Sequence, residues 1–269
     1  MGTGATGVLP SSCFFHPASH RHQAPVAPSV APSGLRSGGG SDIATGVQHD
    51  SGPEHRFSFE RDLVGRGFVR IAGVDEVGRG PLAGPVVAAA VVLPEAWIRD
   101  GLPEPLAGLN DSKQVPARRR EVYDRVLRAS TEVAWSLAVV DSDEIDRVNI
   151  LRATHLAMAR ALEVLVPPPE HVLIDGLPVK TLTFGQTALV QGDARSYSIA
   201  AASILAKVTR DRLMAEYHVR WPEYGFDAHK GYPTAAHLDA LRRLGPCAIH
   251  RRSFAPVAIR LVQPEFFRS

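Results

Sequence analysis

Two periods of apolar residues alternate along the chain after residue 67, and their mixture predicts an α/β fold. Short apolar runs bounded by Gly, Pro or Asp are typical of β-strands. A Gly- and Pro-rich turn joins the first two such runs, so we expect these two strands to pair antiparallel. The predicted strands are Phe68–Asp75, Val86–Leu93, Glu132–Val140, Val172–Asp175 and Thr187–Gln191.

Helical periodicity predicts three helices. Asp143–Leu165 carries an apolar stripe and is followed by three prolines, which cannot continue a helix. A long helix is expected from Ser198 to about Trp221. The last, Ala235–Leu244, has Thr234 as its N-cap and Gly245 as its stop. The order of elements indicates a mixed β-sheet flanked by helices, with a helical C-terminal extension.

Residues 1–66 have a different composition from the rest. They are rich in Gly, Ser, Pro and His, lack apolar periodicity, and include the run Ser37–Ser41. Such a segment buries too little apolar surface to offset the entropy of ordering. We therefore predict a disordered N-terminal tail over residues 1–66 and one folded domain over residues 67–269.

Composition excludes several classes of protein. No segment has eighteen uninterrupted apolar residues, so no membrane span is expected. Cys13 and Cys247 are the only cysteines, too few for a disulfide framework, and a cytoplasmic location is the simpler expectation. Lys and Arg number 30 against 28 Asp and Glu, so nucleic-acid binding would need a local basic patch. Nucleophile-elbow, Walker and dinucleotide-binding patterns do not occur.

Carboxylates follow three of the apolar runs: the pair Asp75-Glu76, then Asp175, then Asp193. A lone Asp-Glu pair before a Gly-rich turn is most often a solvated loop. Acids arriving from three strands, however, are expected to meet at one edge of a sheet. Mg²⁺ and Mn²⁺ take oxygen ligands and share them with substrate phosphates. This pattern therefore favours a two-metal site for phosphodiester chemistry.

The turn after the acid pair suits a phosphate-bearing ligand. Gly78 and Gly80 lack a Cβ, so a ligand backbone could approach the chain closely. Arg79 between them offers a planar fork of donors that matches phosphate.

Eight stretches in this order, with His229–Thr234 counted as one, resemble the bacterial type II ribonuclease H family, and the match covers nearly everything from about Phe68 to Val257. Any one stretch would be weak alone. The acid pair, its glycine-flanked arginine and the proline-rich continuation form the longest of them. The stretches are Gly73–Ala90, Leu109–Lys113, Leu173–Gly176, Gln191–Asp193, Ser198–Asp211, Tyr224–Phe226, His229–Gly231, Tyr232–Thr234 and His250–Phe254.

The resemblance implies a ribonuclease H-like fold and a metal-dependent endonuclease. By it, Asp75, Glu76, Asp175 and Asp193 are the catalytic and metal-binding acids and hold Mg²⁺ or Mn²⁺, two ions when substrate is bound. The implied substrates are RNA–DNA hybrids and duplex DNA with embedded ribonucleotides. Cleavage is expected to leave a 5′-phosphate and a 3′-hydroxyl, and the enzyme is expected to act as a monomer.

The same resemblance implies how substrate is read. The backbone of Gly78-Arg79-Gly80 would contact the 2′-hydroxyl, which distinguishes RNA from DNA, and Tyr232 would stack on the following deoxyribose. Each basic residue below is otherwise a solvated surface charge, and Tyr232 is otherwise a half-buried loop residue. The expected phosphate contacts are Lys113, Lys207 and Lys230, together with Arg210, Arg251 and Arg252.

Three alternatives stay open on the sequence alone. The type III branch of the superfamily carries Gly-Lys-Gly after its acid pair, and Arg79 argues against it. A non-catalytic hybrid-binding module would favour fewer carboxylates. Asp111 is a further candidate acid, although a loop Asp more often caps or positions a neighbour.

Overall fold

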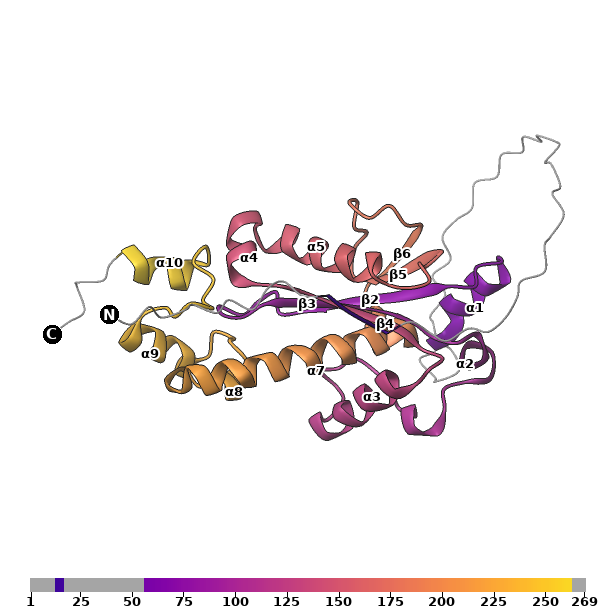
Figure 1. Cartoon of the computed structure of the whole chain (residues 1–269), viewed down its shortest axis with the longest axis horizontal. Helices are drawn as coiled ribbons and strands as arrows, with labels where there is room; N and C mark the ends of the chain where they lie inside the picture. The colour runs from indigo at the N-terminus through magenta and orange to yellow at the C-terminus, as the bar shows by residue number, and fades with distance from the viewer. Residues whose placement is uncertain (1–12, 17–55, 263–269) are drawn as a thin grey trace, which may run out of the picture.

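A mixed sheet runs through the middle of the structure with helices on both of its faces (Figure 1). The computed structural model describes residues 13–16 and 56–262. The strand order is β1-β4-β3-β2-β5-β6. β4, β3 and β2 pair antiparallel, whereas β5 and β6 run parallel to β2. The expected mixed sheet and its antiparallel first pair are confirmed. The strands are β1 Cys13–His16, β2 Ile71–Val77, β3 Val86–Val92, β4 Ala134–Val140, β5 His171–Asp175 and β6 Gln186–Leu189.

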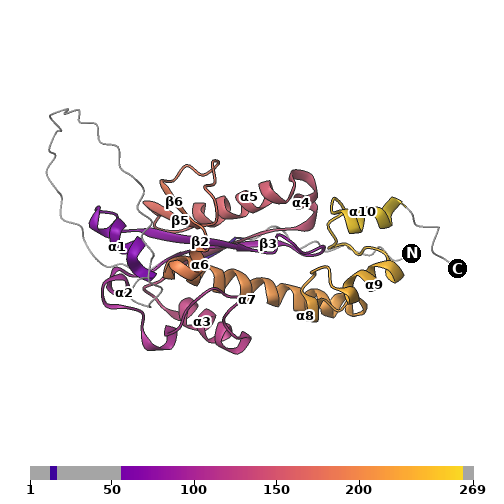
Figure 2. The same cartoon turned by 180° about the vertical axis from the view of Figure 1, so that it is seen from behind.

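The helices form two layers and a C-terminal extension. α4 and α5 cover one face of the sheet, and α3 and α7 cover the other (Figures 1 and 2). No helix among the described residues is both long enough and apolar enough to cross a lipid bilayer. The helices are α1 Ser58–Gly65, α2 Glu95–Asp100, α3 Ala117–Ala129, α4 Ser142–Val148, α5 Ile150–Glu163, α6 Gly192–Arg195, α7 Tyr197–Arg220, α8 Phe226–His229, α9 Ala235–Leu244 and α10 Ala255–Val262, with 3₁₀ turns at Glu104–Leu106 and Pro222–Tyr224.

Both faces of the central strand β3 are buried, which explains its uninterrupted apolar sequence. Val87, Ala89 and Val91 pack in the core that includes α3 and α7. The alternate residues from Val86 to Ala90 pack in the core that includes α5. Because successive strand residues point to opposite faces, one strand serves both cores.

The folded region begins about ten residues earlier than predicted, so the expected tail boundary at residue 66 was wrong. Phe57 and Leu63 are each only 2% exposed. Glu60 is fully buried, and its Oε1 accepts hydrogen bonds from the Ser196 hydroxyl (2.6 Å) and the Ser198 amide (3.1 Å). The error arose because this segment has few apolar residues, which bury only against elements distant in the sequence.

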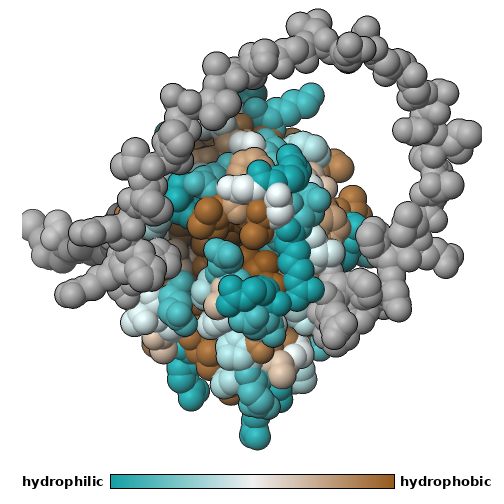
Figure 3. Space-filling view, turned by 90° about the vertical axis from the view of Figure 1, so that its right-hand side faces the viewer, coloured by the Kyte–Doolittle hydropathy of each residue, from teal (hydrophilic) through white to brown (hydrophobic). Residues whose placement is uncertain are grey.

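Around α1 the molecule carries a mixed surface. Phe59, Val64 and Phe68 pack, partly buried, on a small core beneath this helix. Figure 3 looks onto this end of the molecule and shows hydrophobic residues gathered near its middle, with hydrophilic residues around them.

Within the predicted tail, Cys13–His16 forms a short strand that pairs antiparallel with β4. The edge of β4 offers unpaired backbone groups, and the local run of apolar residues suits it. The other tail residues up to 55 lie outside the described part of the chain.

Several predicted boundaries shift. The expected helix Asp143–Leu165 is two helices, α4 and α5, because Asn149 adopts a positive φ of 71° between them and caps α5 through its side chain. The strand expected over Phe68–Asp75 is displaced to Ile71–Val77, so the acid pair lies inside it. The helix Ala235–Leu244, its Thr234 cap and its Gly245 stop are as predicted.

We expect truncation to separate tail from domain. A chain beginning at His55 should unfold at nearly the temperature of the full chain. A chain beginning at Gly67 should lose roughly 3–6 kcal/mol of stability, because it lacks two buried apolar side chains worth about 1.5–3 kcal/mol each. Thermal unfolding followed by circular dichroism measures both. Equal stability of the two truncated chains would contradict the packing of α1.

Candidate active site

The acid pair sits on β2 with its two side chains toward opposite helical layers. Asp75 is 6% exposed and shares its strand face with Gly73, where a Cβ would overlap the backbone of Ser198 in α7. Asp75 also forms a hydrogen bond with Ser203 of α7. Glu76 follows on the other face, where Arg79 contacts it at 3.4 Å.

The other two acids reach the same region from neighbouring elements. Asp175 is the last residue of β5, which lies beside β2. Its Oδ1 accepts a hydrogen bond from the Gly192 amide at 2.7 Å, which ties β5 to the start of α6. Asp193 lies in α6 rather than at a strand end as predicted, because Gln191 adopts a left-handed conformation with φ 56° and turns the chain into this short helix.

Charge repulsion shows that the four carboxylates are close to one another. Burial, followed by the charges of Glu76 and Asp175, raises the pKa of Asp75 well above its ordinary value. Burial, partly opposed by Arg79 and reinforced by Asp175, raises the pKa of Glu76 to about 7. Burial and then the charge of Asp175 raise the pKa of Asp193 to about 6. The site therefore carries more negative charge than the neighbouring basic side chains balance.

Lys113 is a second predicted basic residue, besides Arg79, that interacts with this charge. Burial lowers the pKa of Lys113, but the carboxylates of Asp111 and Asp193, with smaller effects from Asp75 and Asp175, raise it on balance. The lysine charge therefore partly offsets that of the acids.

The donor set fits a hard divalent cation. All four side chains supply carboxylate oxygens, the ligands that Mg²⁺ and Mn²⁺ prefer. Within residues 13–16 and 56–262, no three His, Cys, Asp or Glu side chains are already arranged to hold a metal ion. A bound cation would neutralise the repulsion among the acids.

The residues expected to face substrate also lie close together. A Cβ on Gly80 would lie 3.7 Å from the Tyr232 ring, so the Gly78–Gly80 turn and this tyrosine are neighbours. The ring is 39% exposed and free to meet a ligand. Its main-chain carbonyl contacts Nδ1 of the buried His237 at 2.9 Å. Tyr232 is therefore an exposed ring on an anchored backbone.

The remaining predicted basic residues differ in role. Lys207 pairs with Asp211 at 2.8 Å, and Lys230 has a left-handed backbone with φ 51°. Arg210 and Arg251 were expected to contact phosphate, and that expectation was wrong. Both are 0% exposed, and their guanidinium groups bind backbone carbonyls instead.

Sequence reasoning missed two hydroxyls beside the acids. Ser203, the partner of Asp75, also shares a 2.9 Å hydrogen bond with the Ser112 hydroxyl. Both serines are buried, and Ser203 follows a run of alanines on the long helix, which is the only signal that marked its close packing. Asp111 accepts from the Lys113 amide at 2.9 Å, the capping role considered for it, and it also lies beside Asp193.

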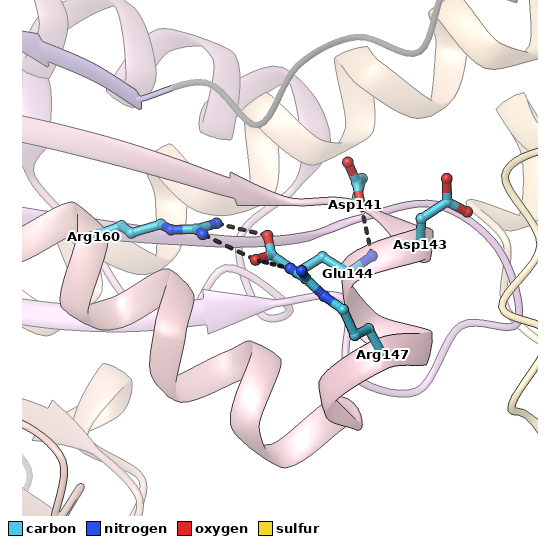
Figure 4. Close-up of a pocket in the computed structure, with 5 residues that line it drawn as sticks. All are labelled: Asp141, Asp143, Glu144, Arg147 and Arg160. Carbon is cyan, nitrogen blue, oxygen red and sulfur yellow. Dashed lines mark hydrogen bonds and ion pairs between the residues drawn. The ribbon is translucent and has the colours of Figure 1, made fainter.

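A separate cavity of about 430 Å³ lies at the start of α4 (Figure 4). An ion-pair cluster lines this cavity, in which Glu144 contacts Arg160 at 2.7 Å and Arg147 at 3.0 Å. Asp141 caps α4 by accepting from the Glu144 amide. None of the four predicted acids lines this cavity, so it does not mark the site.

Comparison with known proteins decides the family. Residues 72–257 match the family model for Ribonuclease HII. The chain belongs to the ribonuclease HII family. Ribonuclease HII of Moorella thermoacetica is 55% identical over 202 residues, which cover 75% of this chain and 94% of that protein. Ribonuclease HII of Syntrophotalea carbinolica is 51% identical over 200 residues, covering 74% and 91%.

Solved structures agree with the fold. The crystal structure of ribonuclease H2 from Pyrococcus horikoshii OT3 superposes with a TM-score of 0.56 at 27% identity, covering 71% of this chain and 96% of that one. The structure of Bst-RNase HIII in complex with Mn²⁺ gives a TM-score of 0.59 at 20% identity, covering 73% and 71%, and at this identity it shows the fold alone.

Family membership confirms the main functional expectations. This ribonuclease HII is a metal-dependent endonuclease that cleaves RNA in RNA–DNA hybrids. The type III alternative is set aside, because the family model and the close relatives are of type HII. The non-catalytic module is set aside because the family is enzymatic.

The repelling acids predict a pH-dependent stability that divalent cations reverse. A carboxyl whose folded pKa exceeds its unfolded pKa stabilises the fold at low pH, and this stability is lost as pH rises through the folded pKa. For Glu76 that window runs from the ordinary value of 4.5 to about 7. With a chelator present, the unfolding free energy should fall by on the order of 1–3 kcal/mol between about pH 5 and about pH 8.

Millimolar Mg²⁺ should restore most of that loss at the higher pH. Asp75→Asn should show a smaller fall, because one repelling charge is absent. Thermal unfolding across the pH range, with and without Mg²⁺, tests this. A midpoint at high pH that ignores Mg²⁺ would argue against a cation site at these acids.

Proposed function

We propose that Asp75, Glu76, Asp175 and Asp193 bind the divalent ions with which this ribonuclease HII hydrolyses the phosphodiester bond beside a ribonucleotide. The observation that supports this most strongly is the raised carboxyl pKa of Asp75, Glu76 and Asp193, to each of which burial contributes first and the charge of Asp175 on β5 contributes as well. The products would be a 5′-phosphate and a 3′-hydroxyl.

Each acid has a distinct position in this proposal. Bound Mg²⁺ or Mn²⁺ would polarise the attacking water and offset charge on the phosphate. Asp75, beside Ser203 on the α7 side, is repelled by the other three acids and would contribute to ion binding. Asp175 is oriented by the Gly192 amide. Lys113 would balance the acids or meet a substrate phosphate.

Substrate choice is proposed to rest on the Gly78-Arg79-Gly80 turn and Tyr232. The turn's backbone would meet the ribose 2′-hydroxyl, and the exposed Tyr232 ring would stack on the next deoxyribose. The closeness of Gly80 to the ring supports a single reader of an RNA-to-DNA junction. This would permit nicking at a lone ribonucleotide in duplex DNA. Lys207 and Lys230 would contact phosphates.

We propose either Mg²⁺ or Mn²⁺ as the cofactor, from the all-oxygen donor set. The Bst-RNase HIII neighbour holds Mn²⁺. A monomer acting in the cytoplasm is part of the same proposal. It is supported by the origin of every proposed site residue in one chain and by the scarcity of cysteine.

Asp75→Asn should abolish cleavage while fold and hybrid binding remain. The substitution removes a metal ligand and relieves repulsion, so thermal stability without metal should rise. Cleavage of a duplex with one ribonucleotide, together with binding of an RNA–DNA hybrid, measures the effect. Asp100→Asn, the same change at an exposed surface acid paired with Arg99, is the control. Full activity of Asp75→Asn with Mg²⁺ would refute the assignment.

Tyr232→Ala should lose cleavage at a single embedded ribonucleotide more than cleavage of a long RNA–DNA hybrid. Aromatic stacking on a nucleotide is worth about 1–3 kcal/mol, and a lone junction offers few other contacts. The measurement is the ratio of kcat/KM on the two substrates at one salt concentration, since phosphate contacts depend on salt. Tyr232→Phe retains the ring and should keep the ratio. If Tyr232→Ala also keeps it, junction sensing lies elsewhere.

A further inference from the structure

Two arginine side chains are buried directly behind the Gly78–Gly80 turn. Arg210 and Arg251 are the largest fully buried side chains of the described residues. Across 56–262, neither forms an ion pair with a carboxylate. Burying a cation is costly unless its donors are satisfied. Backbone carbonyls take that role here.

Arg251 binds the turn itself. Its Nη2 donates to the Gly78 carbonyl at 2.6 Å, and its Nη1 donates to the Arg79 carbonyl at 3.0 Å. Its Nε and Nη2 also donate to the Gly84 carbonyl at 2.9 and 2.8 Å. One planar guanidinium therefore fixes two successive peptide groups against a third.

Arg210 braces the same loop from α7. It donates to the carbonyls of Ala83 (3.2 Å), Pro85 (2.9 Å) and Lys230 (3.0 Å). Lys230 lies two residues before Tyr232, so this contact joins the loop to the segment that carries the ring. Gly78, with φ of 98°, has no room for a Cβ beside the Arg210 side chain.

The direction of these carbonyls determines the direction of two amides. In a trans peptide, the C=O and the N–H of the next residue point in opposite directions. The carbonyls of Gly78 and Arg79 point inward to Arg251, so the N–H groups of Arg79 and Gly80 point outward. No hydrogen bond to either N–H is formed by the residues that the structure describes. The Tyr232 ring lies beside Gly80, and its centre is 5.9 Å from the Arg210 guanidinium.

We propose that Arg251, braced by Arg210, is a positioning residue for ribose selectivity: it holds the Arg79 and Gly80 amides aimed at the 2′-hydroxyl. The proposal rests on the proposed reading of substrate by this turn. It replaces the phosphate-contact role expected for both arginines with an indirect one. The backbone donors do the reading, and the buried guanidinium keeps them from turning away.

The test uses the full chain with Asp75→Asn added, so that binding is measured without cleavage. Binding constants are compared for a duplex carrying one ribonucleotide and for the same duplex as DNA throughout. Arg251→Lys keeps the charge but loses the planar fork. It should lower the preference for the ribonucleotide duplex, taken as its association constant divided by that of the all-DNA duplex, by about three- to tenfold. The reason is that the hydrogen bond between a turn amide and the 2′-hydroxyl, both uncharged, contributes about 0.5–1.5 kcal/mol.

Arg252→Lys is the matched control. It is the same change at the next residue, whose side chain is exposed. It should leave the ratio unchanged while phosphate affinity for both duplexes moves together. A purely structural defect would reduce the amount of active protein and cancel in the ratio. An unchanged ratio in folded Arg251→Lys overturns the proposal.

Tyr232→Ala in the same assay distinguishes failure of the proposed substrate reading from failure of the role of Arg251. If it leaves the ratio unchanged and Arg251→Lys does too, the proposed reading of substrate fails. If it lowers the ratio and Arg251→Lys does not, only the role of Arg251 fails.

A measurement on the unmodified chain covers the case in which Arg251→Lys does not fold. Backbone ¹⁵N relaxation should give the Arg79 and Gly80 amides order parameters near those of rigid backbone, about 0.85. Values below about 0.6 would mean that the turn moves freely despite its arginines, and would overturn the proposal.

Discussion

The close packing of α7 against β2 is the contact on which the rest of the structure depends. Gly73 has no side chain, and this lets the helix backbone at Ser198 lie directly against the strand. The same helix then brings Ser203 to Asp75, holds the buried Glu60 through Ser196 and Ser198, and carries Arg210 to the loop after β2. One helix thus sets the spacing between the acid cluster and the turn that we propose faces substrate.

The site combines two costly electrostatic features with opposite remedies. At the acids, negative charges repel one another, and the proposed divalent ions would supply the balance. Behind the Gly78–Gly80 turn, positive charges are buried without carboxylate partners among the described residues, and the protein supplies the balance itself through backbone carbonyls. The first arrangement stores free energy that ion binding releases. The second arrangement costs stability but fixes the direction of two peptide groups. A side-chain substitution on the turn could not fix these directions alone.

The extent to which sequence predicted this molecule follows from the range of the interactions involved. Local periodicity and short motifs were enough to predict the sheet and α9 with its caps, and to name the four acids as candidates. Asp193 was predicted at a strand end rather than in α6. The residue with the left-handed conformation, Gln191, is not a glycine, so nothing in the sequence indicated this turn. α1 was missed, since its few apolar residues gain meaning only against partners far along the chain. Arg251 looked like a surface charge for the same reason: nothing in its neighbourhood in the sequence indicates carbonyls contributed from residues 78–84.

The divergent directions of Asp75 and Glu76 bear on how the enzyme responds to its surroundings. If these acids hold the ions as proposed, a ligand set completed by phosphate oxygens would hold ions weakly between encounters with nucleic acid. Ion binding and substrate binding would then reinforce each other, and release of the nicked product would weaken both. Turnover would depend on the concentration of free divalent ions as well as on the supply of ribonucleotides.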